Sequence, residues 1–276
     1  MAPWRRLVLR SSACVLSILL LAASSLSAQQ AFTPERQEEF LKTAKVLSTR
    51  PAGKGVTGTL RATLSDGVLT HEASIQTVDI EKREFRSNRG TELNFKDAWR
   101  YNVAAYRLNQ ILRLGNMPVS VERDYNGKPG AFTWWVDDVL MDEDERFKTK
   151  TQSPDALAWN EQMWHIRLFD ELIANVDRNL GNLVIDKNWA VWMIDHTRAF
   201  RLSNDLKNPK SLTNIERAAL DRLKALSLES INSAVGDYLT SYEKKSMLQR
   251  RDDIVALFAK GGGATRIYEK TRARPQ

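Results

Sequence analysis

Two stretches in the first half of the chain alternate between apolar and polar residues. In residues 59–78 the alternation surrounds Ser65-Asp66-Gly67, and in residues 117–140 it surrounds Asn126-Gly127. Asp-Gly and Asn-Gly between alternating runs are typical of β-hairpins, because successive side chains of a strand point to opposite faces. The sequence therefore predicts two antiparallel hairpins.

Apolar residues with helical spacing precede and separate these hairpins. Residues 34–47 follow Thr33 and begin with a proline, and residues 95–115 end at a glycine. Threonine before proline is a helix start signal, and glycine is a common stop signal, so both segments are predicted to be helices. The polar stretches 48–58 and 81–94 are predicted to be connections.

The second half of the chain has a different pattern. Residues 141–155 are charged and are predicted to form a loop, whereas residues 156–174 have the apolar spacing of a helix. Two short apolar strands are predicted at 182–186 and 190–195, and the remainder is predicted to be helical. Two of these helices are predicted to begin with a capping box, at Thr213 with Glu216 and at Thr240 with Glu243.

The first 28 residues have the three-part pattern of a secretory signal peptide. They carry Arg5, Arg6 and Arg10, no acid, and an apolar run that ends in small residues near Ser27-Ala28. The run is short for a membrane span, although a short N-terminal anchor helix is the alternative. Cys14, the one cysteine, lies in this segment, so no disulfide is expected in the exported chain. The protein is therefore expected to be periplasmic or extracellular, or in a secretory lumen, without a membrane span after cleavage.

The net charge of the chain is small once residues 1–28 are set aside. The whole chain has 41 basic and 34 acidic residues, a net charge of +7. Removing the three arginines of residues 1–28 leaves 38 against 34, or +4. The basic residues are dispersed along the sequence, so no nucleic-acid partner is expected.

Three oxygen-bearing side chains flank the predicted strand pair 182–195. Asp177 and Asn182 precede the first strand, and Asp195 directly follows the second. Because a hairpin brings its two ends together, these three side chains are expected to converge. Such oxygens are suited to Mg²⁺, and a carboxylate free of metal can accept a hydroxyl proton. The histidines lack the spacing of a zinc site.

The phrases FDELIANVDRNLGNLVID and IDHTRAF resemble the catalytic loop and metal-binding segment of the protein-kinase-like superfamily. The branch resembled is that of phosphatidylinositol 3-/4-kinases, HipA-type kinases and secretory-pathway kinases, over residues 55–205. The resemblance implies that Asp177 is the catalytic base and that Asn182 and Asp195 are magnesium ligands. The alternative is that Asp177 and Asn182 only cap and turn the chain.

The same resemblance implies an α+β, two-lobed fold. A signal peptide (1–28) and an N-terminal helix with linker (29–54) would precede an N-lobe (55–140) with a small antiparallel sheet and one long helix. A mainly helical C-lobe (141–276) would follow.

The predicted N-lobe departs from the kinase pattern at two positions. Where that pattern has a phosphate-binding lysine and its glutamate partner, this chain has Gln76 and Asn102. These two amides could hydrogen-bond but cannot neutralise phosphate charge. Lys82 and Lys96 are candidates for a displaced phosphate-binding lysine, or are solvated surface lysines. Residues 54–58 could form a short phosphate-covering turn.

Four further residues are expected around the site: Arg178, Asn179, His196 and Arg198. The two arginines would either bind phosphate or pair with nearby carboxylates to orient the loop. His196 would either contact the shell of a bound metal or serve as a satisfied turn histidine.

Two function classes follow. The first is an exported phosphotransferase that uses ATP with Mg²⁺ or Mn²⁺ and transfers phosphate to a hydroxyl acceptor, which the sequence does not identify. The second is a catalytically inactive, kinase-like module that binds nucleotide or protein, which Gln76 and Asn102 favour. A metal-dependent hydrolase would need more carboxylates than the predicted site provides. The oligomeric state is left open.

Overall fold

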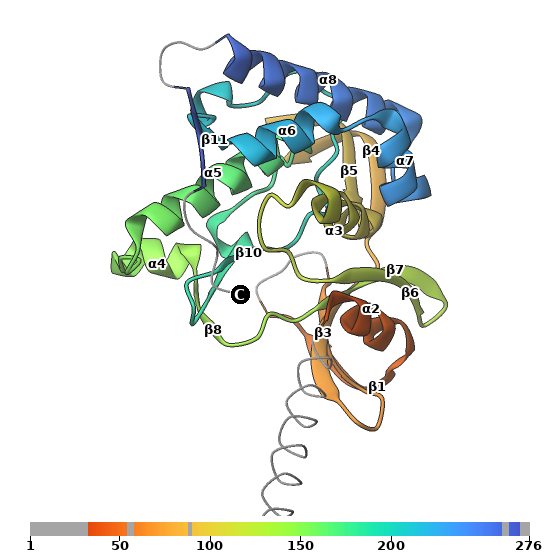
Figure 1. Cartoon of the computed structure of the whole chain (residues 1–276). Coiled ribbons are helices and arrows are strands. Elements are labelled where there is room, and N and C mark those ends of the chain that lie inside the picture. Colours follow the sequence, from red (N-terminus) through yellow and green to blue (C-terminus); the bar gives the residue numbers. More distant parts are fainter. Residues whose placement is uncertain (1–32, 54–57, 88–89, 261–264, 271–276) are drawn as a thin grey trace, which may run out of the picture.

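The computed structural model describes residues 33–53, 58–87, 90–260 and 265–270. The predicted signal peptide and residues 54–57 of the predicted phosphate-covering turn lie outside these ranges. In Figure 1 an antiparallel sheet with helix α2 forms one end of the molecule, and helices α5, α6 and α8 form the other. Within the described residues the chain is α+β, with the sheet-rich and helical parts that the sequence predicted.

The N-terminal lobe is built on a five-stranded antiparallel sheet in the order β1-β2-β3-β7-β6. Helix α2 packs on its β6–β7 end, and its N-cap Thr33 accepts a hydrogen bond from the Arg36 backbone. Both predicted hairpins are confirmed, with Gly67 and Asn126-Gly127 at positive φ in their turns. The elements of this lobe are α2 (Pro34–Thr43), β1 (Lys45–Pro51), β2 (Leu60–Ser65), β3 (Thr70–Gln76), β6 (Ser120–Tyr125) and β7 (Lys128–Trp134).

Two stretches predicted to be connections contain strands, and the predictions were wrong for the residues in those strands. The first four residues of the predicted linker 48–58 belong to β1, which pairs with β2 along the sheet edge. Residues 81–94 fall in the hairpin of β4 (Asp79–Ser87) and β5 (Gly90–Ala98). Charged residues occur on both faces of this hairpin, so the sequence does not show the apolar–polar alternation that is typical of strands. Cross-strand partners nevertheless hold it together, including the ion pair of Glu81 with Lys96 at 3.5 Å.

Helix α3 (Arg100–Leu112) connects the two lobes and is shorter than the predicted 95–115, because its first predicted residues complete β5. Its Tyr106 belongs to the core under the sheet, whereas Leu108 belongs to the helical core. Figure 1 accordingly places α3 between the sheet and the helices. Helix α3 therefore packs against the cores of both lobes.

The C-terminal lobe contains the helices and a three-stranded sheet in the order β10-β9-β8. The predicted loop 141–155 contains helix α4, so that prediction was wrong. Asp142 caps this short helix, acidic residues fill its first turn and basic residues its last, which suits the helix dipole. The elements are β8 (Val139–Asp142), α4 (Glu143–Thr149), α5 (Ala156–Leu172), β9 (Leu183–Asp186), β10 (Val191–Met193), α6 (Arg217–Ala225), α7 (Leu228–Val235) and α8 (Ser241–Ala259).

One predicted capping box forms and the other does not. Thr240 and Glu243 make both reciprocal bonds at the start of α8. Thr213 and Glu216 do not, because residues 214–216 form strand β11 (Asn214–Glu216), which pairs in parallel with β12 (Arg266–Tyr268). The carboxylate of Glu216 lies 3.4 Å from His165 Nε2 instead of turning back to a helix N-terminus.

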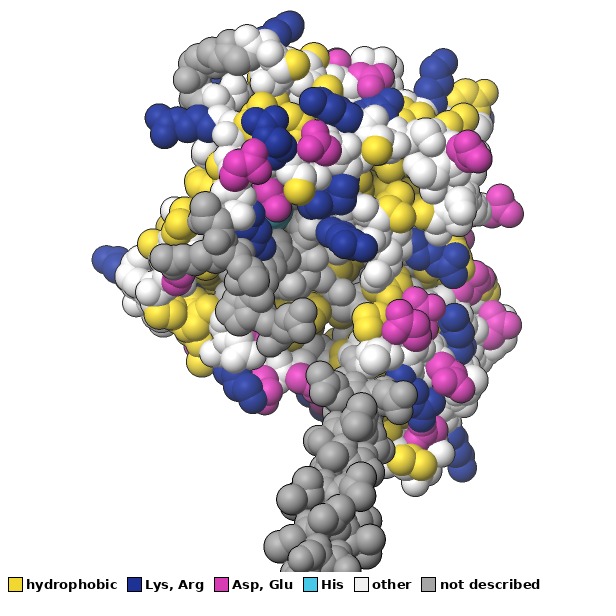
Figure 2. Space-filling view, viewed as in Figure 1, with side chains coloured by type: hydrophobic (Ala, Val, Ile, Leu, Met, Phe, Trp, Pro, Cys, Tyr) yellow, Lys and Arg dark blue, Asp and Glu magenta, His cyan; other side chains and the backbone are white. Residues whose placement is uncertain are grey.

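The surface shown in Figure 2 carries charges of both signs. Lysine and arginine side chains are interspersed with aspartate and glutamate over both lobes on this face. Among the described residues, none of the helices combines the length and the apolar character that crossing a bilayer requires.

Candidate functional site

The loop that carries Asp177 and Asn182 follows helix α5 and is held by its own side chains. The backbone N–H of Asp177 donates to Asn175 Oδ1 at 3.2 Å, which forms an Asx turn. Asn182 Nδ2 donates to the carbonyl of Asp177 at 3.4 Å, and a single 3-10 turn, Leu180–Asn182, leads into β9. The Asp177 carboxylate is left about one-third exposed. The loop therefore presents this carboxylate without using it as a cap.

Strands β9 and β10 close the site as the sequence predicted. Met193 pairs with Leu183, and the Ile194 backbone N–H donates to the Asn182 carbonyl at 3.1 Å. Asp195 follows directly, with the positive φ of +56° that aspartate tolerates better than most residues. Asp177, Asn182 and Asp195 all line one cavity.

Arg178 does not line that cavity. Its side chain is a clamp that holds the loop in place through several hydrogen bonds. Its guanidinium donates to both carboxylate oxygens of Asp170, with donor–acceptor distances of 3.0–3.2 Å. It also donates to the carbonyls of Asn182 at 3.0 Å and Ile194 at 2.8 Å. One side chain thus joins α5, the loop and the end of β10. Two roles were predicted for this arginine, phosphate binding and pairing with a carboxylate. Its geometry is that of the second role, with Asp170 as the partner.

His196 is fully enclosed beside this clamp. Burial lowers its pKa well below the ordinary value, and the charge of Arg178 lowers it further. The neutral ring can accept at Nε2 from Arg178 Nη2, 2.9 Å away, and its edge packs against Phe169. His196 thus has the contacts of a satisfied turn histidine.

Gln76 and Asn102 are in direct contact. The sequence allowed for a hydrogen bond between these two amides. Asn102 Nδ2 donates to Gln76 Oε1 at 2.7 Å, and Gln76 Nε2 donates to Asp195 Oδ1 at 3.3 Å. Asn102 Oδ1 also accepts from the His196 backbone at 2.7 Å. This buried chain of amides links β3 and α3 to the segment after β10 without adding any charge.

The cavity lies between the lobes and has a volume of about 1150 Å³. This exceeds the roughly 300–1000 Å³ typical of small-molecule sites, so it has room for a nucleotide and a second group. Both lobes contribute, with Thr59 and Gln76 on one side and Asp177, Asn182 and Asp195 on the other.

The cavity lining is strongly acidic. Among the described residues, two arginines line it, and both are paired: Arg61 with Glu72, and Arg198 with Glu92. Nine carboxylate residues of the described part of the chain line it: Glu72, Asp97, Asp137, Asp138, Asp142, Asp144, Glu145, Asp177 and Asp195. Such a lining favours cations, and a polyphosphate could enter only with them.

Asp97 is a site residue that the sequence reasoning missed. It lies on β5 in the segment misread as a helix start, and only 4% of its surface is exposed. Burial raises its pKa, and the charges of Asp195 and Asp177 raise it further, while a hydrogen bond from Thr197 and the charge of Arg198 oppose the shift. The signal in the sequence, a lone aspartate before a helix, is too common to have identified it.

Arg198 and Asn179 both line the cavity beside Asp177. Arg198 Nη1 lies 3.6 Å from Asp177 Oδ1, and its guanidinium stacks over Phe95 at 5.0 Å. Asn179 Nδ2 donates to the Asp177 carbonyl at 3.5 Å. Arg198 is therefore a cation within ion-pair distance of the predicted catalytic base.

Lys82 and Lys96 do not line the cavity. Lys96 Nζ lies 3.2 Å from the buried carboxylate of Glu243, which also accepts from Tyr101 and caps α8. Burial favours the neutral form of Glu243, but these donors outweigh burial and lower its pKa. Lys82 lies over the Phe85 ring on the exposed hairpin. Their positions support structural roles and give no support to phosphate binding.

The donor set fits a hard divalent cation, but only with help from a ligand. In the described parts of the chain, no three histidine, cysteine, aspartate or glutamate side chains are grouped closely enough to hold a metal ion. Asn182 and Asp195 supply two oxygen donors, and Mg²⁺ commonly takes one or two protein ligands and completes its shell with water and phosphate. The site therefore fits a metal that arrives with a phosphate ligand.

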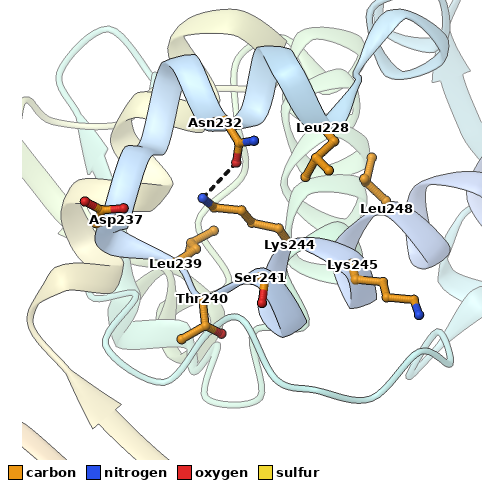
Figure 3. Close-up of a pocket in the computed structure, with 9 residues that line it drawn as sticks. All are labelled: Leu228, Asn232, Asp237, Leu239, Thr240, Ser241, Lys244, Lys245 and Leu248. Atoms are coloured by element: carbon orange, nitrogen blue, oxygen red, sulfur yellow. Dashed lines mark hydrogen bonds between the residues drawn. The ribbon is translucent and has the colours of Figure 1, made fainter.

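A second cavity, of about 640 Å³, lies between α7 and α8 (Figure 3). Its main polar feature is Lys244, which is buried and donates from Nζ to Asn232 Oδ1 at 2.9 Å. Leu228, Leu239 and Leu248 form its apolar wall. The hydrogen bond from Lys244 to Asn232 ties α8 to α7. None of the predicted site residues lines this cavity.

Several solved structures have a fold similar to that of this chain. The chain is similar to hydra Fam20 solved with sugar, at a TM-score of 0.61 and 16% identity, covering 85% of this chain and 92% of that one. It is similar to the Golgi casein kinase at a TM-score of 0.57 and 12% identity, covering 82% and 74%. The same kinase with Mn/ADP bound gives a TM-score of 0.56 at 12% identity, covering 81% and 75%.

These likenesses show that the chain has a protein-kinase-like fold, as predicted. At such low identity they speak for the fold alone. No protein-family model matches the sequence, and no curated protein matches it either.

Proposed function

We propose that the protein is an exported kinase-like phosphotransferase that uses ATP with Mg²⁺ or Mn²⁺ to phosphorylate a hydroxyl acceptor. The observation that carries this proposal is the convergence of Asp177, Asn182 and Asp195 on one wall of a cavity large enough for a nucleotide. The kinase-like fold supports the proposal, because kinases carry a catalytic base and metal ligands in a loop of this kind. Export rests on the N-terminal segment and accords with a Golgi kinase among the similar structures.

Each residue has a separate task in this mechanism. Asn182 and Asp195 would hold the divalent cation, which when bound supplies the positive charge that offsets the phosphates. Asp177, partly exposed and clear of the hydrogen bonds that fix the loop, would orient the acceptor hydroxyl and accept its proton on a carboxylate oxygen. Arg198, whose Nη1 lies 3.6 Å from Asp177 Oδ1, would help to hold this carboxylate in position.

A second candidate function is supported by one observation. The hydrogen-bonded Gln76–Asn102 pair stands where a phosphate-binding lysine and its glutamate are expected. A protein with this pair could bind a nucleotide or a protein without transferring phosphate. The two candidates differ in whether nucleotide binding depends on metal and whether phosphate is released.

Replacing Asp195 by asparagine tests the metal-dependent half of the proposal. Calorimetric titration with ADP should show binding in the presence of Mn²⁺ that chelation of the metal weakens strongly. Asp195→Asn should weaken the metal-dependent affinity by at least about tenfold, because even the loss of an outer-shell partner costs roughly 10- to 100-fold.

Asp205→Asn, the same change at an exposed carboxylate of the C-terminal lobe, serves as the control and should bind like the wild type. Equal binding with and without metal would favour the inactive module. Absence of nucleotide binding under both conditions would overturn both candidates.

A further inference from the structure

Asp97 has a shortage of hydrogen-bond donors that a structural carboxylate would not have. Its Oδ1 is buried and has no hydrogen-bond partner among the residues that the structure describes. The Thr197 hydroxyl forms a hydrogen bond with the Asp97 carboxylate, yet it also lies 3.2 Å from Asp195 Oδ1. A hydroxyl has one proton to donate, so it cannot satisfy both carboxylates at once.

This shortage is costly unless something else binds the oxygen. A buried carboxylate without a partner loses its hydration and gains nothing in return, which is why buried charges are normally paired or bound to metal. Here the neighbouring charges of Asp195 and Asp177 add repulsion. Arg198, the nearby cation, is already shared between Glu92 and Asp177.

The charge balance of the cavity indicates what the missing partner is. Neither lining arginine is free, and Gln76 supplies no charge in the lysine position. A nucleotide polyphosphate adds further negative charge to a lining that already has nine carboxylates. Added cations would balance these charges, and carboxylate oxygens are the ligands that Mg²⁺ and Mn²⁺ prefer.

We propose that Asp97, together with Asp195, holds a second divalent cation that enters with the nucleotide and replaces the positive charge of the absent lysine. This inference rests on the proposed function, because the cation needs phosphate oxygens to complete its shell. Asp97 and Asp195 make only two carboxylates, which agrees with the lack of a self-sufficient metal cluster among the described residues. The second cation is thus expected only in the presence of nucleotide.

The number of bound Mn²⁺ ions tests this proposal without any activity measurement. Free Mn²⁺ is measured by electron paramagnetic resonance while the protein is titrated at saturating ADP. The wild type and Asp205→Asn should bind about two Mn²⁺ per chain, as two-metal phosphoryl sites do. Asp97→Asn should bind about one, and Asp97→Glu, which keeps the carboxylate, should still bind about two with weaker affinity.

Thermal unfolding without ligands provides the second readout. Asp97→Asn should raise the midpoint of the protein without ligands, because it removes a buried charge that has no full partner. A carboxylate needed only for structure would give the opposite shift.

Two Mn²⁺ ions in Asp97→Asn, or one in the wild type, would overturn the second site and leave the proposed function standing. A wild type that binds ADP with no Mn²⁺ at all, or does not bind ADP, would overturn both.

Discussion

Replacing Asp177 by asparagine should lower the release of ADP from ATP by about 10²- to 10⁴-fold, the usual contribution of a general base. The amide keeps the shape of the carboxylate but cannot accept the proton of the acceptor hydroxyl. Binding of ADP with Mn²⁺ should be nearly unchanged, because Asp177 is not one of the proposed metal ligands. Turnover is measured as ADP release with water as the acceptor, and binding is measured by calorimetry.

Two comparisons make this result specific to the base. Asp205→Asn makes the same chemical change at an exposed position and should retain full turnover. Asp177→Asn should unfold at a temperature equal to or above that of the wild type, since it removes one of the charges that face Asp97. Retained turnover in a folded Asp177→Asn protein would remove Asp177 from the role of base.

Replacing Arg178 by alanine should cost about 3–5 kcal/mol of unfolding free energy, the range seen when one partner of a buried ion pair is removed. The change leaves the largely buried Asp170 carboxylate without its guanidinium and frees the carbonyls of Asn182 and Ile194. Because those carbonyls fix both ends of the site, nucleotide binding should be lost as well. Urea unfolding at neutral pH gives the free energy.

Arg178→Lys separates charge from geometry at the same position. Lysine keeps the positive charge but cannot make the two-pronged contact with Asp170 while also reaching both carbonyls. Its stability should therefore fall between those of the wild type and Arg178→Ala. A loss below about 1 kcal/mol in Arg178→Ala, the size of a surface pair, would contradict the clamp.

The loop that carries Asp177 and Asn182 could be predicted from sequence because its geometry is local. The strands at 182–186 and 190–195 are apolar and separated by a turn, so a hairpin follows, and with it the proximity of Asn182 and Asp195. The contact of Gln76 with Asn102 followed from a resemblance that places the two positions opposite each other.

The contacts that sequence reasoning missed join residues far apart in the chain. Lys96 looked available to phosphate because its partner Glu243 lies 147 residues later, on α8. Asp97 was missed because its neighbours Asp177 and Asp195 come from the other lobe. Neither partner can be inferred from spacing or periodicity, since both depend on how the lobes pack.

Secondary structure was mispredicted where charge hides the apolar pattern. The hairpin β4–β5 is stabilised by cross-strand pairs on a largely exposed surface, and α4 by an N-cap and a favourable order of charges. The predicted capping box at Thr213 had the correct spacing. It does not form because residues 214–216 pair with a strand more than fifty residues later.

The most direct test of the account is a thermal-shift titration of the protein with ATP, with and without Mg²⁺ or Mn²⁺. With metal, ATP at about 100 times its dissociation constant should stabilise the fold by roughly 2.7 kcal/mol, which corresponds to a rise of about 5–10 °C in a chain of this size. Without metal the rise should be small, because the acidic cavity repels the phosphates. No stabilisation at millimolar ATP, with either metal present, would contradict the claim that Asp177, Asn182 and Asp195 form a metal–nucleotide site.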